Sequence, residues 1–268
     1  MEIVNDLPEE LYLEYDEFLA YVGIYDDKLR IERYKKFIKK LNPRDKVCVE
    51  AGAGYGVFAE FMLKLGAGKV YVVERNRFML NILREKFGNN SRVEIIGCDI
   101  KEFVPEDDIY LLVHDFYGAM LYDEDLHALE ELKFKPGNVL PDAGRLMVAV
   151  VNADNYLDTA VNRKVLEQLK GVLVTDLFAV KNTLVKQLKG VEVLHWHYES
   201  GLRGGRLDIS NYEGDLLVFW VELVHGGQLL CRAGECFNWP LVWTPRAGDV
   251  FEIGFTKRGA APSFKWIK

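Results

Sequence analysis

The amino-terminal segment shows a helical alternation of apolar and charged side chains. Between residues 12 and 41 apolar residues recur at three- and four-residue spacing, at Leu29, Tyr34, Phe37, Ile38 and Leu41. This spacing places them on one face of a helix, with charged residues on the other. Asn42 and Pro43 then break the pattern, so we expect the helical segment to end at residue 41.

The next region alternates between strand and helix patterns. Short apolar runs typical of buried strands lie at 46–50, 69–74, 92–96, 109–113 and 145–151. Helical spacing occurs between them, at 57–65, 79–87 and 121–132. Strand and helix in turn predict a Rossmann-like α/β domain, in which helices cover both faces of a parallel sheet.

After residue 152 the pattern becomes that of a β domain. One helical stretch covers 158–169, and strand-like runs follow at 191–198, 216–224, 228–232 and 249–255. Gly226 and Gly227 between two of these runs predict a hairpin turn. We therefore expect an N-terminal helical segment, a Rossmann-like domain and a smaller β-barrel-like domain, at 1–41, 42–152 and 153–268.

Composition limits the partners of the chain. Its 268 residues are 49% hydrophobic, enough for a sizeable core, and a net charge of -7 argues against nucleic acid as a partner. Residues 1–6 lack the features of a signal peptide, and no apolar run approaches a membrane span. We expect a cytoplasmic protein without a membrane partner. We also expect no metal, and reduced, buried thiols at Cys48, Cys98, Cys231 and Cys236.

A glycine-rich loop follows the first strand of the α/β region. It reads Glu50-Ala51-Gly52-Ala53-Gly54-Tyr55-Gly56. Glycines at this point let the backbone approach a nucleotide cofactor, although a plain tight turn would look the same. A dinucleotide fingerprint would need glycine at position 57, which is Val57 here. The loop therefore favours S-adenosylmethionine over NAD, with Glu50, Gly52, Gly54 and Gly56 in the site.

Acidic residues also follow the second and third strands. Glu74 can accept hydrogen bonds from both ribose hydroxyls of a nucleoside. Asp99 stands where such enzymes place an acceptor for the adenine amino group. Three acceptors at three consecutive strand ends favour one nucleoside site over three unrelated acidic residues.

The segment after the fourth strand resembles the double-glutamate hairpin of the protein arginine methyltransferases. In that family Ser-Glu-Trp-Met-Gly-Tyr is followed by a second glutamate, nine residues after the first. Asp115, Gly118 and Glu124 match the two acids and the glycine at the same spacing. Residues 132–142 are also similar to the family's stretch that ends in Phe-Pro-Asp. The resemblance implies that Asp115 and Glu124 hold an arginine of a protein or peptide while S-adenosylmethionine donates a methyl group.

The chemistry of arginine fits this implied pair of acids. Two carboxylates can hold a guanidinium in a fork, and positioning supplies most of the acceleration in an in-line methyl transfer. Glu124 would begin the helix expected at 121–132, where the helix dipole favours its ionised form.

Two further matches lie outside the α/β region. Residues 27–34 resemble the family's amino-terminal helix, whose arginine clamps the cofactor carboxylate, and Arg30 takes that position. Asn238 and Trp239 resemble a degenerate Thr-His-Trp loop in which asparagine replaces histidine. The resemblance places these two residues at the acceptor pocket, together with Phe116 and Tyr117.

Departures from the family leave the acceptor open. Asp115 is one methylene shorter than glutamate, which moves a carboxylate by about an ångström, and Phe116 and Ala119 replace the tryptophan and tyrosine. The alternatives are a small-molecule or non-arginine acceptor, an inactive S-adenosylmethionine-binding regulator, and an NAD-linked oxidoreductase. A homodimer also remains open, because only residues 158–189 could serve as a dimerisation arm.

Overall fold

The computed structural model describes residues 21, 23–179, 184–236, 238–255 and 261–267. Most of the segment expected to be helical before residue 23 therefore lies outside the described residues. Helix α2 (Lys28–Leu41) ends where the sequence predicts. The Asp27 side chain caps its first turn by accepting a hydrogen bond from Arg30 N, and Asn42 closes it in the left-handed conformation.

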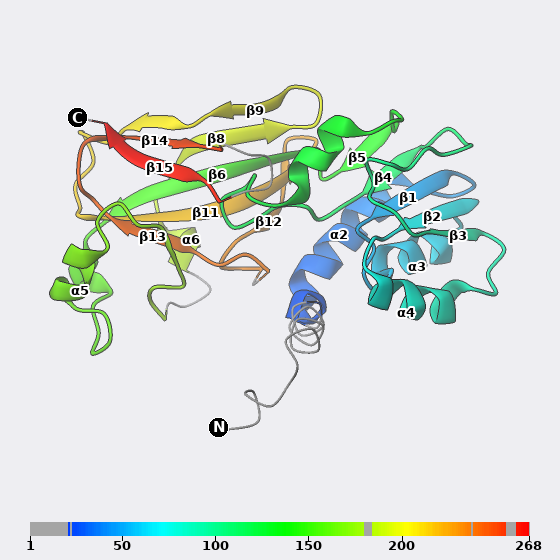
Figure 1. The fold of residues 1–268 in the computed structure, drawn as a ribbon, viewed down its shortest axis with the longest axis horizontal. Helices are drawn as coiled ribbons and strands as arrows, with labels where there is room; N and C mark the ends of the chain where they lie inside the picture. The colour runs from blue at the N-terminus through cyan, green and yellow to red at the C-terminus, as the bar shows by residue number, and fades with distance from the viewer. Residues whose placement is uncertain (1–20, 22, 180–183, 237, 256–260, 268) are drawn as a thin grey trace.

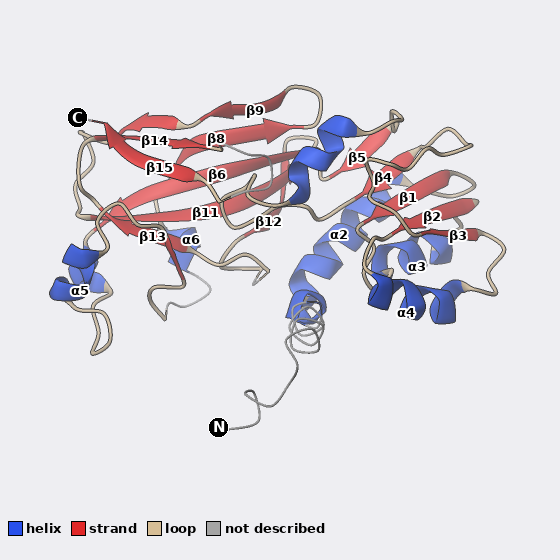
Figure 2. Cartoon of the chain, in the orientation of Figure 1, coloured by secondary structure: helices blue, strands red, loops and turns tan. Residues whose placement is uncertain are grey.

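The α/β region contains a five-stranded parallel sheet in the order β3-β2-β1-β4-β5 (Figure 1). Its strands are β1 (Val47–Ala51), β2 (Lys69–Val73), β3 (Val93–Ile96), β4 (Leu111–Val113) and β5 (Asn138–Leu140). Helices α3 (Val57–Lys64) and α4 (Arg77–Phe87) lie along the same side of it (Figure 2). The strand order reverses between β1 and β4, and such a reversal opens a crevice at the carboxyl ends of the strands.

The alternation of helix and strand stops after β3. Residues 97–137, all of them described, contain no α-helix, and the helix expected at 121–132 is a 3-10 helix, η2 (Asp125–Glu131). No side chain caps its start. Phe103 from this region packs against Tyr71 of β2 and against Phe134, with ring centroids 5.1 and 5.5 Å apart. Aromatic side chains from this region thus supply packing against β2.

The remaining strands form antiparallel sheets, in agreement with the expected β-barrel-like domain. One sheet has the order β7-β13-β11-β6-β8-β9, with β12 paired to β11, and the other has the order β10-β14-β15. Gly205 joins them, because its N donates to Val193 O and its O accepts from Ile253 N. The strands are β6 (Ala143–Val151), β7 (Val174–Thr175), β8 (Val191–His197), β9 (Gly201–Gly204), β10 (Arg206–Asp208), β11 (Leu216–His225), β12 (Gln228–Arg232), β13 (Val242–Pro245), β14 (Val250–Gly254) and β15 (Ser263–Ile267).

The strand expected at 145–151 is present, but its assignment to the parallel sheet was wrong. As β6 it pairs antiparallel with β11 and with β8. The chain therefore passes from one sheet to the other between Leu140 and Ala143, earlier than the expected boundary at 152. A continuous apolar run does not distinguish a buried parallel strand from a buried antiparallel one, which explains the error.

The hairpin predicted after residue 216 is confirmed. Gly226 and Gly227 have φ values of 54° and 75°, the left-handed conformation that a two-residue hairpin turn requires. The helical stretch expected at 158–169 is shorter, as α5 (Arg163–Gln168). Residues 180–183 of the expected dimerisation arm lie outside the described residues, and its other elements are β7 and α6 (Leu184–Gln187). A short 3-10 helix, η3 (Ala153–Asn155), follows β6.

Helix α2 lies between the parallel sheet and the β domain (Figure 1). Its Phe37 ring meets His225 of β11 edge-on, with centroids 5.7 Å apart. Arg33 forms an ion pair with Glu235 at 2.6 Å, in the loop after β12. These two contacts hold the end of β11 and the loop after β12 against the helix that leads into the parallel sheet.

Burial of the cysteines matches the expectation for three of the four. Cys48, Cys231 and Cys236 are buried free thiols, whereas Cys98 is half-buried, so its predicted burial was wrong. Cys98 follows β3 at the open edge of the sheet, which explains its exposure. Among the described helices, none has the length and apolar character needed to cross a bilayer.

Candidate active site

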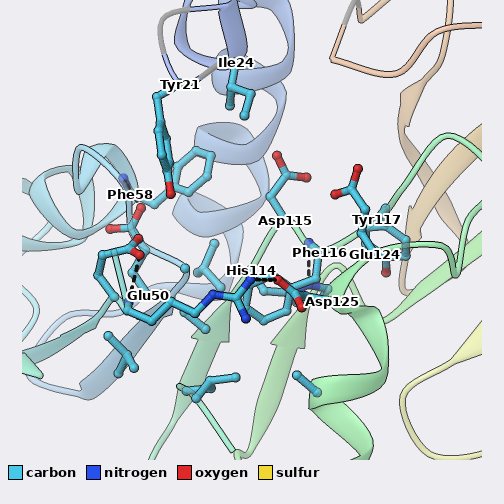
Figure 3. A pocket seen from close by; sticks show the side chains of 18 of the residues that line it. Tyr21, Ile24, Glu50, Phe58, His114, Asp115, Phe116, Tyr117, Glu124 and Asp125 are labelled. Carbon is cyan, nitrogen blue, oxygen red and sulfur yellow. Dashed lines mark hydrogen bonds and ion pairs between the residues drawn. The ribbon is translucent and has the colours of Figure 1, made fainter. Parts of the chain in front are cut away.

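A cavity of about 410 Å³ lies at the carboxyl ends of β1 to β4 (Figure 3). This volume is in the range of small-molecule sites. The cavity brings together ten of the residues predicted from the sequence: Arg30, Glu50, Gly52, Glu74, Asp99, Asp115, Phe116, Tyr117, Glu124 and Asn238. Three others, all described, stand behind its wall: Gly54, Gly56 and Trp239.

Each glycine of the loop after β1 is required by a different neighbour. All three have φ between 51° and 65°, which disfavours other residues. A Cβ on Gly52 would lie 2.6 Å from the Phe116 ring, and one on Gly56 would lie 2.6 Å from the Phe87 ring of α4. A Cβ on Gly54 would meet the Tyr25 side chain. The sequence analysis expected the cofactor to lie beside Gly54, but the Tyr25 side chain occupies that space.

Tyr25 is a residue of the site that the sequence analysis missed. Its hydroxyl donates to Ala53 O at 2.9 Å and accepts from Tyr55 N at 3.0 Å, so it fastens the amino-terminal segment onto the glycine loop. Burial raises the pKa of this hydroxyl, which stays protonated. The only signal in the sequence was the position of Tyr25 five residues before Arg30, and no local pattern links it to the loop.

Glu50 joins β1 to the first turn of α3. Its carboxylate accepts hydrogen bonds from Phe58 N at 3.1 Å and Ala59 N at 2.6 Å. Burial raises the pKa of Glu50 to about 8, against the opposing effect of these two bonds. The side chain lines the cavity but already uses both oxygens, so it orients the loop and the helix.

Glu74 is nearly saturated by backbone donors. One carboxylate oxygen accepts from Arg75 N and Asn76 N, and the other accepts from Gly54 N, all at 2.8 Å. A carboxylate has about four lone-pair positions. Glu74 can therefore accept one ribose hydroxyl without losing a backbone bond, whereas the sequence predicted two.

Asp99 lines the cavity next to a bridging arginine. Its carboxylate accepts from Lys101 N at 3.0 Å, which fixes the turn after β3. Arg75 forms ion pairs with Asp99 at 3.5 Å and with Asp125 at 2.8 Å. The sequence analysis missed Arg75 and Asp125, because the two lie 50 residues apart and only the fold makes them neighbours.

Asp115 lies just beyond β4 and faces α2. It forms an ion pair with Arg30, and it accepts a hydrogen bond from the Tyr34 hydroxyl at 2.9 Å. Burial raises the pKa of Asp115, while the Arg30 guanidinium and the Tyr34 bond oppose that rise. The Arg30 side chain is 2% exposed, and its Nε has no hydrogen-bond partner in the described part of the chain.

Glu124 stands at the solvent side of the cavity, directly before η2. The residue is exposed to solvent, but neighbouring atoms still desolvate its carboxylate in part. This desolvation, followed by the negative charges of Asp123, Asp115 and Asp125, raises the pKa of Glu124 to about 7. The expectation that a helix dipole favours the ionised form was therefore wrong. The helix that follows is a 3-10 helix, and desolvation together with the surrounding carboxylates outweighs any dipole of so short an element.

The four residues expected at the acceptor pocket divide into two groups. Phe116, Tyr117 and Asn238 line the cavity. Trp239 is buried behind it and donates from Nε1 to Tyr117 O at 2.6 Å. The Tyr117 ring packs edge-on against Trp196 of β8, with centroids 5.9 Å apart. Tyr117 and Trp239 therefore tie the segment after β4 to the β domain.

Within the described ranges, no three His, Cys, Asp or Glu side chains are grouped so that they could hold a metal ion. The charged side chains that line the cavity include its carboxylates and two guanidinium groups, Arg30 and Arg75.

Curated proteins named histone-arginine methyltransferase match part of this chain. A histone-arginine methyltransferase CARMER of Drosophila grimshawi is 26% identical over 163 residues, and its counterpart in Drosophila ananassae is 25% identical. Each match covers 56% of this chain and 30% of the relative. The chain thus spans about a third of the length of the curated relatives it matches. No protein-family model matches the chain.

Solved structures extend the likeness to the whole fold. A crystal structure of PRMT6 matches with a TM-score of 0.69 at 11% identity, over 94% of this chain and 99% of that one. The Trypanosoma brucei PRMT1 enzyme-prozyme complex matches with a TM-score of 0.63 at 14% identity, over 87% and 86%. This chain is thus similar in sequence to proteins named histone-arginine methyltransferases and similar in fold to solved PRMT structures. Its Rossmann-like domain and β domain follow the fold of those structures.

Proposed function

We propose that this protein is an S-adenosylmethionine-dependent methyltransferase that transfers a methyl group to an arginine side chain of a protein or peptide. One observation carries the proposal. A single cavity contains the strand-end acceptors Glu74 and Asp99, and also the paired acids Asp115 and Glu124. The first two suit a nucleoside, and Glu124 of the second pair suits a cation beside it.

The residues present fit the methyl donor. Arg30 lines the cavity, is buried, and has an Nε donor without a partner in the described part of the chain. A carboxylate is the natural partner for such a donor, and the methionine part of S-adenosylmethionine carries one. The open acceptor position on Glu74 and the placement of Asp99 suit the ribose and the adenine.

The chemistry asks mainly for positioning. S-adenosylmethionine supplies an activated methyl group on a sulfonium. Ionised Glu124 would attract a guanidinium to the mouth of the cavity and orient one of its nitrogens toward the donor. Because the pKa of Glu124 is about 7, binding of a cation would favour its ionised form.

Labelled methyl transfer tests this function. Purified protein would be incubated with S-adenosylmethionine labelled in the methyl group and with two peptide pools, identical except that arginine is replaced by lysine in one. We expect label in the arginine pool, recovered as methylarginine after hydrolysis. Label in neither pool despite measurable binding of S-adenosylhomocysteine would point to another acceptor.

A second function is favoured by the occupancy of Asp115. Arg30, Tyr34 and Asn238 all contact its carboxylate, which leaves little room for an acceptor guanidinium. A protein that binds S-adenosylmethionine but regulates a partner, or methylates a small molecule, would be compatible with that arrangement. Binding of S-adenosylhomocysteine without methylation of any peptide would support this second function.

Location and assembly belong to the same proposal. Four free cysteines favour a reducing compartment such as the cytoplasm. The Trypanosoma brucei neighbour is a heterotetrameric complex, and we propose that this protein also forms an oligomer, with a homodimer as the simplest form. Sedimentation of the purified chain would distinguish a dimer from a monomer.

A further inference from the structure

Asp115 is held by side chains from two separate parts of the molecule. Its Oδ1 accepts from the Tyr34 hydroxyl at 2.9 Å, and its Oδ2 pairs with the Arg30 guanidinium; both partners belong to α2. Asn238, from the loop after β12, places its Nδ2 3.4 Å from the same Oδ2. Three of about four lone-pair positions are therefore already engaged.

Arg30 is oriented by the same network. Nη1 pairs with Asp115, and Nη2 donates to Ile24 O at 2.6 Å. Two of the three nitrogens are fixed, so the plane of the guanidinium is fixed as well. The remaining nitrogen, Nε, is buried at the cavity wall without a partner among the described residues. Asp115 thus determines where the free donor of Arg30 lies.

Glu124 differs from every other carboxylate of the cavity. Six acidic residues line it, and five have a hydrogen-bond donor or cation from the chain: Glu50, Glu74, Asp99, Asp115 and Asp125. For the Glu124 carboxylate the described residues supply neither. Its carboxylate is exposed and free to receive a group from solution.

We infer that the two acids have separate roles: Asp115 is a positioning residue that acts through Arg30 on the donor, and Glu124 alone supplies the carboxylate for the acceptor. The inference rests on the proposed function. It differs from the arrangement that the sequence resemblance implies, in which both acids bind the acceptor. It follows that Asp115→Asn impairs binding of the donor's amino-acid part, whereas Glu124→Gln impairs transfer and leaves donor binding intact.

Calorimetry with two ligands separates these roles. S-adenosylhomocysteine carries the carboxylate that Arg30 would bind, and adenosine lacks it. We expect Asp115→Asn to weaken S-adenosylhomocysteine binding about tenfold and to leave adenosine binding unchanged, because a misplaced guanidinium loses a charge-assisted bond. Glu124→Gln should bind both ligands as the wild type does. Asp108→Asn and Glu106→Gln, both exposed in the loop between β3 and β4, are the matched controls.

A double variant tests whether Asp115 acts through Arg30. In an Arg30→Ala background the further change Asp115→Asn should have no effect on S-adenosylhomocysteine binding, because the group it orients is gone. Unchanged or tighter binding by Asp115→Asn alone would overturn the inference. So would an equal loss in the presence and absence of Arg30.

Two readouts keep this test separate from the proposed function and from misfolding. If the wild type binds no S-adenosylhomocysteine, both the proposed function and the division of roles are wrong. If the wild type binds the ligand and Asp115→Asn binds it equally well, only the division of roles is wrong. Adenosine affinity reports whether the variant has folded around an intact nucleoside site. Tyr34→Phe, which removes one donor to Asp115 and keeps both charges, should weaken S-adenosylhomocysteine binding by less than Asp115→Asn.

Discussion

Replacement of Arg30 by alanine should separate two parts of the donor site. The change removes the buried, unpartnered Nε donor of a residue that lines the cavity, and it also removes the partner of Asp115. A hydrogen bond between charged groups contributes about 1.5–3 kcal/mol. At about 1.4 kcal/mol per factor of ten, the affinity for S-adenosylhomocysteine should fall about tenfold to a hundredfold. Adenosine, which has no carboxylate, should bind as tightly as before.

Titration calorimetry at fixed pH measures both affinities. Arg30→Lys should fall between wild type and alanine, because a point charge cannot serve Asp115, Ile24 O and a ligand carboxylate together. Arg84→Ala, on the exposed side of α4, is the control and should bind both ligands normally. Equal losses for the two ligands in Arg30→Ala would refute the reasoning, because they would mean that Arg30 supports the fold and not the carboxylate.

Three further predictions follow from the site. Because the pKa of Glu124 is about 7 and a cation needs the ionised form, kcat/KM for an arginine acceptor should rise with pH through about 7; an equal rise in Glu124→Gln would contradict this. Gly52→Ala should lower the free energy of unfolding by about 1–2 kcal/mol more than Gly226→Ala does. Both glycines have positive φ, but only a Cβ on Gly52 would contact the Phe116 ring. Equal losses of stability in denaturant titrations of the two variants would contradict this reasoning. Trp239→Phe should destabilise the protein by about 1–3 kcal/mol, because the buried Tyr117 carbonyl loses its hydrogen-bond donor. An unchanged denaturation midpoint would show that this hydrogen bond does not stabilise the fold.

Features that depend only on short stretches of sequence could be predicted. The glycines after β1 and the acidic residues after β2 and β3 each lie at the end of a strand that local periodicity reveals. The parallel sheet brings such ends together, so their shared cavity follows from the fold class alone. The turn at Gly226 and Gly227 is equally local.

Features that depend on contacts between distant residues were not predictable. Arg30 and Asp115 are 85 residues apart, and nothing in either neighbourhood specifies their ion pair. The sheet membership of β6 depends on the partner strand β11, which comes much later in the chain. The ionisation of Glu124 depends on desolvation and on neighbouring acids, which only the folded cavity brings about. In each case the local sequence specifies the helix, strand or side chain, and tertiary packing determines which residues it contacts.

The most direct test of the central claim is the rate of a single turnover with and without the Glu124 charge. Wild type and Glu124→Gln, each saturated with labelled S-adenosylmethionine, would be mixed with an arginine peptide that the wild type methylates. The account predicts that the rate falls about 10²–10³-fold in Glu124→Gln, as for removal of one well-placed electrostatic group, with unchanged affinity for S-adenosylhomocysteine. Methylation of the peptide by Glu124→Gln at the wild-type rate would contradict the claim that this carboxylate holds the acceptor.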